Sequence, residues 1–296
     1  MGTTNKQVNA YRALLEGLEY VGPKMRAFVE DAKRMAPSGK VAVHCWRGGQ
    51  RSSSMGWLLD LAGMDVQVLE GGYKAYRNHV LEQFASCRPR LLIVGGPTGS
   101  GKTDVIHSLE KLGEQVIDLE GLANHRGSAF GGLGLQPQPG QKQFEALLWQ
   151  ELEGLRDAAY LVTEGESLHI GRLQVPKKFH QAMQVEKSLW LNASLELRTR
   201  IILEDYPALD QLREQFERPL LALKERLGKQ VVAELLELLQ QGQWEQLVRE
   251  LMVRYYDPLY LHTLPEQRLE IELDPLEQGC LRVAAALDSL TPKAAF

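Results

Sequence analysis

Short runs of apolar residues alternate along the chain with longer segments in which apolar residues recur every three or four positions. The short runs are typical of buried strands, and the longer spacing is typical of helices with one apolar face. The predicted strands lie at residues 40–44, 66–69, 91–94, 115–119, 160–163, 188–191 and 268–273. Strands that alternate with helices form mostly parallel sheets covered on both faces, so the predicted fold class is α/β.

Two segments are helical by pattern over almost their whole length, residues 8–36 and residues 195–256. Residues 78–90 have the pattern of a connector, and a chain of 296 residues has room for two cores. We therefore expect a smaller α/β domain over residues 1–88. A larger parallel-sheet domain with a largely helical C-terminal portion is expected over residues 89–296.

The composition is that of a globular protein without a membrane segment. No stretch approaches the roughly 18 uncharged apolar residues of a membrane helix, and the first residues lack the apolar core of a secretory signal. Cys45, Cys87 and Cys280 show no metal-ligand spacing and leave an odd count, which disfavours a disulfide framework and favours the cytoplasm. The net charge of −4 gives no overall attraction to nucleic acid, so such binding requires local basic patches.

Cys45 follows a predicted strand and opens a loop rich in glycine and arginine. The backbone N–H groups of such a loop, and the N-terminus of the helix after it, stabilise a thiolate. Arg47 and Arg51 add positive charge, and Gly48 and Gly49 let the backbone curl around an anion. Cys45 is therefore a candidate nucleophile that can accept sulfur or selenium or attack a phosphate ester. The alternative is a buried structural cysteine.

A second loop, residues 96–103, matches the G-x-x-x-x-G-K-[ST] pattern that cradles phosphate groups between a strand and a helix. In this pattern backbone N–H groups wrap around phosphate oxygens, Lys102 reaches the distal phosphate, and the Thr103 hydroxyl ligates Mg²⁺. The residues expected to bind a diphosphate are Gly96, Thr98, Gly99, Ser100, Gly101, Lys102 and Thr103. The pattern leaves open whether the ligand is a nucleotide or another small-molecule diphosphate.

Acidic residues end two of the predicted strands that follow this loop. Glu164 occupies the expected place of a carboxylate that supports Mg²⁺ together with Thr103, and Glu166 is a second candidate for that role. Asp118 is expected to point into the same crevice, at the carboxyl ends of the parallel strands, which makes it a candidate catalytic residue. The alternative is that these acids cap helices.

Residues 41–76 resemble the second half of a rhodanese domain, through the loop 45–51 and the closing segment 68–76. The resemblance implies that Cys45 carries a persulfide or a perselenide. The opening strand of that family has no counterpart ahead of residue 40, so we expect a partial rhodanese-like domain. Unless the helices of residues 8–36 cover them, the strands around 41–44 and 66–69 should leave exposed apolar surface.

Three further segments, residues 118–128, 164–171 and 255–260, together with both loops, resemble the tRNA 2-selenouridine synthase family. The resemblance covers almost the whole chain, from about residue 10 to residue 290. It implies that the sulfur of a wobble 2-thiouridine in tRNA is replaced by selenium through an S-geranyl intermediate. The implied co-substrates are geranyl diphosphate and selenophosphate.

The resemblance also implies roles for individual residues. Cys45 would take selenium from selenophosphate, whose anion would be held by Arg47, Gly48, Gly49 and Arg51. Lys102 would act in catalysis with Mg²⁺, by stabilising the charge that develops on the leaving diphosphate.

A phosphate or tRNA contact is implied for His125 and Arg126, with His125 as a candidate proton shuttle, although a lone histidine is more often structural. Other basic residues would contact tRNA or remain solvated on helix faces, namely Arg172, Lys177, Lys178, Arg198 and Arg200. Tyr255, Tyr256 and Tyr260 would stack on a base, line a prenyl pocket or pack in the core. The alternative function is an ATP-dependent small-molecule kinase or NTPase fused to a rhodanese-like sulfur carrier.

Overall fold

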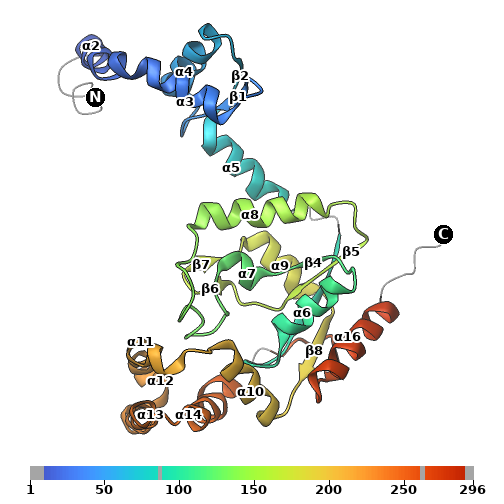
Figure 1. The fold of residues 1–296 in the computed structure, drawn as a ribbon. Coiled ribbons are helices and arrows are strands. Elements are labelled where there is room, and N and C mark those ends of the chain that lie inside the picture. Colours follow the sequence, from blue (N-terminus) through green and yellow to red (C-terminus); the bar gives the residue numbers. More distant parts are fainter. Residues whose placement is uncertain (1–9, 86–88, 261–263, 291–296) are drawn as a thin grey trace. The chain divides into compact units, whose positions relative to one another are not determined.

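The computed structural model describes residues 10–85, 89–260 and 264–290 (Figure 1). Contacts between residues divide the chain into two compact units, and the division falls between His79 and Val80, inside helix α5 (Gly72–Gln83). The domain boundary predicted at residue 88, like Cys87, lies outside the described residues, so that boundary stays a prediction.

The first unit contains a parallel pair of short strands and the helices around it. Its elements are α2 (Ala10–Val21), η1 (Gly22–Lys24), α3 (Met25–Met35), β1 (Lys40–Val43), α4 (Gln50–Leu61), β2 (Asp65–Val68) and the start of α5. The strands pair from Lys40 opposite Asp65 to Val43 opposite Val68. These elements agree with the two strands and the long helical segment predicted for this part of the chain.

The first unit buries little of its apolar surface. Among its described residues, the buried hydrophobic side chains are Ala13, Leu59 and Met64. At the end of β2, the side chains of Val68 and Leu69 are 42% and 39% exposed. Val41, Val43 and Val66 are half-buried, so the predicted exposure of apolar surface is found at the end of β2 and not at the valines of β1.

The second unit is built on a five-stranded sheet with the order β4-β5-β3-β8-β9, in which every neighbouring pair is parallel. The strands are β3 (Arg90–Gly95), β4 (Val116–Ile117), β5 (Tyr160–Glu164), β8 (Ser188–Asn192) and β9 (Arg268–Glu272). A short antiparallel pair, β6 (His169–Ile170) and β7 (Leu173–Gln174), lies apart from this sheet. Because β3 is paired on both sides and buried from residue 91 onward, its continuous apolar run is that of a central parallel strand. The α/β fold class is confirmed.

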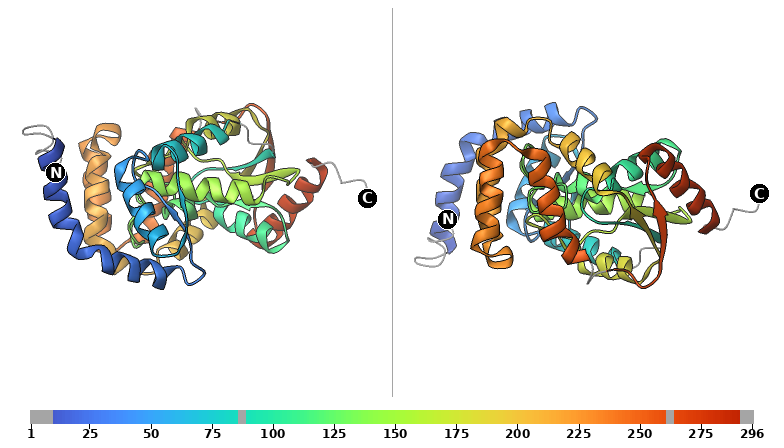
Figure 2. Two further views of the ribbon diagram at one scale, coloured as in Figure 1. Left: turned by 90° about the horizontal axis from the view of Figure 1, so that it is seen from above. Right: turned by 90° about the horizontal axis from the view of Figure 1, so that it is seen from below.

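Helices cover the sheet, as the views in Figures 1 and 2 show. They are α6 (Lys102–Lys111), α7 (Leu119–Ala123), α8 (Gln141–Gly154), α9 (Lys177–Val185) and α16 (Leu276–Leu290). Apolar residues of α6 and α16 pack with those of the strands in one core, which includes Leu92, Val94, Ile106, Leu109, Val283 and Leu287. This core fixes the start of α6, which directly follows the phosphate loop.

The helical portion predicted at residues 195–256 forms a second core of its own. Its elements are α10 (Leu195–Asp205), α11 (Leu209–Ala222), α12 (Lys224–Leu227), α13 (Lys229–Gln241), α14 (Trp244–Leu251), the π-helix η2 (Met252–Tyr256) and α15 (Asp257–Tyr260). Its core is rich in aromatic side chains; Phe216, for example, stacks on Phe130 with ring centroids 5.5 Å apart. None of the described helices combines the length and apolar character needed to cross a membrane.

Candidate functional site

The phosphate loop joins β3 to α6, as its sequence predicted. Gly99 and Gly101 have φ angles of +76° and +75°, a region in which glycine is favoured over residues with a side chain. The hydroxyl of Ser100 is buried without a hydrogen-bond partner, and the Lys102 amine donates to the carbonyl of Gly96 at 3.3 Å. A loop with an unpaired buried hydroxyl and a half-buried lysine has polar groups that can bind a ligand.

A cavity of about 1050 Å³ opens against this loop. One part of its wall is the loop itself and the start of α6, from Thr98 to Asp104. Another part is apolar and comes largely from the helical portion, with Phe130, Tyr206, Phe216, Trp244, Leu247, Leu251, Tyr255, Tyr256 and Leu259. The same cavity therefore offers phosphate-binding groups and a wall suited to a hydrocarbon.

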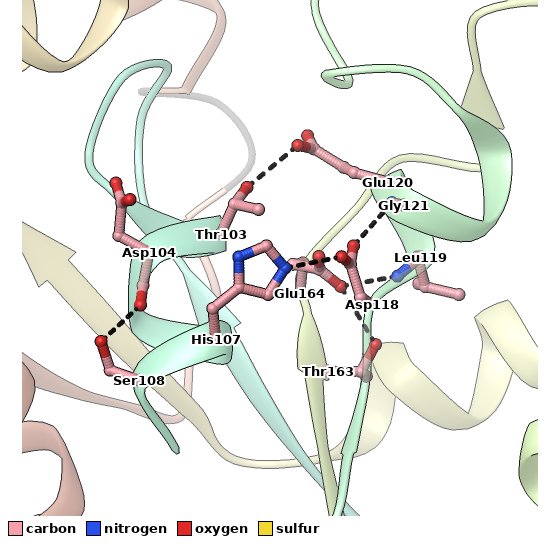
Figure 3. A network of polar contacts seen from close by, with 10 residues as sticks. All are labelled: Thr103, Asp104, His107, Ser108, Asp118, Leu119, Glu120, Gly121, Thr163 and Glu164. Atoms are coloured by element: carbon pink, nitrogen blue, oxygen red, sulfur yellow. Dashed lines mark hydrogen bonds and ion pairs between the residues drawn. The ribbon is translucent and has the colours of Figure 1, made fainter. Parts of the chain in front are cut away.

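The carboxylate that contacts Thr103 is Glu120, which sequence reasoning missed. The Thr103 hydroxyl donates to Glu120 Oε2 at 3.1 Å, whereas Glu164 is fully buried and accepts the backbone N–H of Leu119 at 3.0 Å (Figure 3). Burial and the nearby Glu166 raise the pKa of Glu120 to about 8. Burial also raises the pKa of Glu164. Glu120 could have been found as the acid in the first turn of the short helix α7.

Asp118 does not face the cavity, contrary to expectation. It caps the N-terminus of α7, where its carboxylate accepts the Gly121 N–H at 2.6 Å, and it lies 2.9 Å from Nε2 of His107 (Figure 3). The described wall of the cavity does not include it. The helix-cap alternative is the one that the structure supports for this residue.

His125 and Arg126 are adjacent in sequence but lie in different environments. The His125 ring packs against the backbone at Gly171, where an added Cβ atom would lie 2.7 Å from its Nε2. Burial lowers the pKa of His125. His125 is not among the described residues that line the cavity, so its predicted phosphate or tRNA contact has no support from the cavity wall. Arg126 does line the cavity, with its guanidinium 4.4 Å from the centre of the Tyr206 ring and a hydrogen bond to the carbonyl of Leu133.

Arg198, expected among the solvated or tRNA-binding bases, is buried instead. Its side chain is 7% exposed and forms an ion pair with Asp257, with a shortest N–O distance of 2.6 Å. Its Nε donates to the carbonyl of Thr98 in the phosphate loop at 2.9 Å. Asp257 lies in the segment 255–260, so that segment touches the loop through Arg198.

Cys45, in the first unit, accepts two hydrogen bonds at its sulfur. They come from the N–H of Gly49 at 3.2 Å and the hydroxyl of Ser52 at 3.3 Å, at the start of α4. The Ser52 hydrogen bond is the main cause that lowers the pKa of Cys45 to about 6. Arg47 and Arg51 are exposed beside it. The thiolate is therefore the dominant form of this side chain at neutral pH.

The loop around Cys45 is held by a second glycine turn. A Cβ atom at Gly72 would lie 2.3 Å from the carbonyl oxygen of Cys45, and one at Gly48 would lie 2.6 Å from the amide nitrogen of Gly71. The Tyr73 N–H donates to the Cys45 carbonyl at 2.9 Å. These approaches leave no room for a side chain at Gly48 or Gly72. Among the described residues, no group of three or more His, Cys, Asp or Glu side chains is placed to hold a metal ion.

Replacing Ser52 by alanine is expected to raise the pKa of Cys45, because the thiolate loses its strongest hydrogen-bond donor. The rate of alkylation of Cys45 in the wild type should rise with pH and level off above about pH 6. In Ser52→Ala the rate should level off at a higher pH. Iodoacetamide labelling followed by peptide mass spectrometry measures both curves, with Ser54→Ala on the same helix as control. Identical curves for wild type and Ser52→Ala would contradict this account of the thiolate.

Comparison with known proteins gives a consistent result. The sequence profile described as the tRNA 2-selenouridine synthase AAA domain matches residues 89–287. A protein of Shewanella frigidimarina named tRNA 2-selenouridine synthase is 33% identical, over 90% of this chain and 81% of its own length. Proteins of the same name from Cupriavidus pinatubonensis and Nitrosomonas europaea are 37% and 32% identical, over 78% and 91% of this chain and 70% and 82% of theirs.

Proposed function

The chain belongs to the tRNA 2-selenouridine synthase family, and on this premise we propose how its two sites divide the reaction. It is a transferase that modifies wobble uridine in tRNA. The second unit transfers a geranyl group from geranyl diphosphate to the sulfur of 2-thiouridine. Selenophosphate bound at the Cys45 loop of the first unit then delivers its selenium to the uridine with the help of the Cys45 thiolate: a bond from selenium to C2 of the uridine forms, geranyl thiolate leaves, and hydrolysis of the selenium–phosphorus bond releases phosphate. The reaction takes place in the cytoplasm.

The main support for this proposal is that the cavity in the second unit has both a phosphate-binding part and an apolar part. The phosphate loop forms one part of its wall, and aromatic and aliphatic side chains form another. Geranyl diphosphate has the same two parts, a diphosphate and a hydrocarbon of ten carbons. A volume of about 1050 Å³ is ample for such a molecule. A wall of aromatic and aliphatic side chains is suited to the geranyl chain, and we therefore infer a prenyl diphosphate rather than a nucleotide as the ligand.

The transfer step follows from the positions of the polar groups. The loop N–H groups and Lys102 hold the diphosphate, and charge develops on it as the bond to the geranyl carbon breaks. Burial alone would lower the pKa of Lys102, but Tyr260 and the carboxylates of Glu166 and Glu120 outweigh it and raise the pKa. Lys102 therefore stays charged inside the cavity and opposes the growing negative charge.

Thr103 and Glu120 fit a Mg²⁺ ion. Both offer oxygen ligands, which Mg²⁺ prefers, and their 3.1 Å contact brings these oxygens to one place beside the phosphate loop. Buried Glu164, whose pKa is raised by burial and by nearby acids that include Glu120, is the proposed supporting carboxylate. When bound, Mg²⁺ would neutralise charge on the diphosphate.

The exposed loop of the first unit is suited to selenium transfer. Its thiolate is stabilised by Gly49 and Ser52, and Arg47 and Arg51 provide the positive charge to hold selenophosphate. Gly48 and Gly49 let the backbone curl around the Cys45 sulfur, to which the Gly49 N–H donates, beside the place proposed for the anion. Among the residues of the second unit, Arg126 is the proposed contact for phosphate or tRNA, because it lines the cavity. His125 has no such role in this proposal.

Binding measurements test the proposed ligand. Leu259, which is 39% exposed and lines the apolar wall, offers a surface position for an Asp substitution. Leu259→Asp should weaken binding of geranyl diphosphate about tenfold or more, because apolar contact is lost, and leave binding of inorganic diphosphate unchanged. Leu281→Asp, at a position 60% exposed on α16, is the control. Calorimetry in the presence of Mg²⁺ that finds tight ATP binding and no geranyl diphosphate binding would favour the kinase or NTPase alternative.

A further inference from the structure

The helical portion touches the phosphate loop at two atoms of one residue, Thr98. From α10, Arg198 Nε donates to the Thr98 carbonyl at 2.9 Å. From α15, the Tyr260 hydroxyl lies 3.2 Å from the Thr98 hydroxyl, at hydrogen-bond distance. Thr98 is the third residue of the loop and lies ahead of the N–H groups that would face a diphosphate. Its backbone and side chain are therefore both fixed from outside the loop.

Arg198 owes its orientation to Asp257. Two hydrogen bonds join the guanidinium to the carboxylate, at 2.6 and 3.1 Å, in the bidentate geometry that fixes the plane of an arginine side chain. Because the Arg198 side chain is 7% exposed, water cannot replace these bonds without a rearrangement. The position of Asp257 therefore decides where the Arg198 Nε points, and through it where the Thr98 carbonyl lies.

The segment that carries Asp257 and Tyr260 also carries part of the apolar wall. Tyr255, Tyr256 and Leu259 line the cavity on the same turns. The preceding turn, Met252–Tyr256, is a π-helix, whose extra residue shifts the side chains that follow around the helix axis. Such turns occur frequently at functional sites. Here the π-helix lies directly ahead of the residues that contact Arg198 and the loop.

The loop is also packed tightly against α10. A Cβ atom at Gly99 would lie 2.7 Å from Cδ1 of Ile202 and 3.1 Å from the carbonyl oxygen of Arg198. The loop backbone therefore follows the position of the helical portion. In the same loop, the buried hydroxyl of Ser100 has no partner in the protein, which independently indicates that the loop is built for a ligand.

We propose that Asp257 and Tyr260 are positioning residues that fix the conformation of the phosphate loop through Thr98, Asp257 by way of Arg198 and Tyr260 directly. Binding of a hydrocarbon at the apolar wall and binding of the diphosphate at the loop therefore strengthen each other. The proposal rests on the proposed binding of geranyl diphosphate and adds a coupling between its two parts. A hydrocarbon that orders the segment 255–260 also orders the contacts to Thr98. By linkage, a diphosphate that orders the loop strengthens binding of the hydrocarbon to the same extent.

The test uses the two halves of the ligand separately, inorganic diphosphate and geraniol, with the full chain and Mg²⁺. In the wild type, saturating geraniol should tighten diphosphate binding by roughly 5- to 150-fold, the usual range of such coupling. Asp257→Asn and Tyr260→Phe should each reduce this factor strongly. Thr98→Val combined with Tyr260→Phe should be no worse than Tyr260→Phe alone, because the Tyr260 hydroxyl that contacts Thr98 is already lost. Calorimetric titration gives each Kd.

The matched control is Glu234→Gln, which is also a change from carboxylate to amide. Glu234 pairs with Arg254 of the same π-helix at 2.7 Å, from α13, and has no contact with the loop. This variant should keep the wild-type coupling factor. If Asp257→Asn is too unstable to measure, Tyr260→Phe, which removes one hydroxyl, decides the question.

The outcomes separate this inference from the proposed function. If geraniol leaves diphosphate affinity unchanged in the wild type while geranyl diphosphate is still transferred to tRNA, the coupling is refuted and the proposed function stands. If geranyl diphosphate is not a donor at all, the proposed function fails, whatever the coupling. Coupling that survives in both Asp257→Asn and Tyr260→Phe would refute the positioning role of these residues.

Discussion

Lys102→Ala is expected to lower the rate of geranyl transfer to tRNA by about 10²-fold or more, the usual effect of removing a charged or hydrogen-bonding group that stabilises a transition state. Lys102 is half-buried, Tyr260 and nearby carboxylates raise its pKa, and its amine donates to the backbone carbonyl of Gly96 at 3.3 Å. In this account its charge opposes that of the leaving diphosphate. Single-turnover assays on 2-thiouridine tRNA measure the effect.

A second lysine on the same helix provides the control. Lys111 lies exposed in the last turn of α6, so Lys111→Ala changes the same charge without touching the cavity. It should transfer the geranyl group at the wild-type rate. Lys102→Ala that also works at the wild-type rate would remove the phosphate loop from the mechanism.

Cys45→Ala is expected to abolish selenium incorporation while geranylated tRNA accumulates. In the proposed reaction, geranyl transfer uses groups of the second unit, whereas selenium delivery requires the thiolate that Gly49 and Ser52 stabilise. Nucleoside mass spectrometry after incubation with geranyl diphosphate and selenophosphate separates the two products. Cys280→Ala, which removes a half-buried thiol of raised pKa in α16, is the control and should form selenouridine normally.

Two results would contradict this division of labour. Normal conversion of geranylated tRNA to selenouridine by Cys45→Ala would show that Cys45 does not act in selenium delivery. Loss of geranyl transfer in the same variant would show that the two sites are not chemically independent.

The strands and the phosphate loop could be predicted because their signals are local. Four consecutive apolar residues, 91–94, mark the central strand, and the glycines, Lys102 and Thr103 follow it at fixed spacing. The two strands of the first unit were also predictable, because residues 40–44 and 66–69 are short apolar runs.

The partners of the acids and bases could not be predicted, because they depend on contacts between distant segments. Arg198 and Asp257 are 59 residues apart, and a lone arginine on a helix has the same pattern whether it is solvated or buried. Asp118 and Glu120 are two residues apart, yet one caps α7 and the other contacts Thr103. No sequence signal marks the π-helix at 252–256. The side of this segment that faces the loop could therefore not be predicted.

The central claim is that the cavity beside the phosphate loop serves a prenyl diphosphate for tRNA modification. The most direct measurement is incubation of the full chain with 2-thiouridine tRNA, Mg²⁺ and geranyl diphosphate, without selenophosphate, followed by nucleoside mass spectrometry. The account predicts S-geranyl-2-thiouridine in the wild type and its loss in Lys102→Ala. Unchanged 2-thiouridine in the wild type, with ATP hydrolysed under the same conditions, would contradict it.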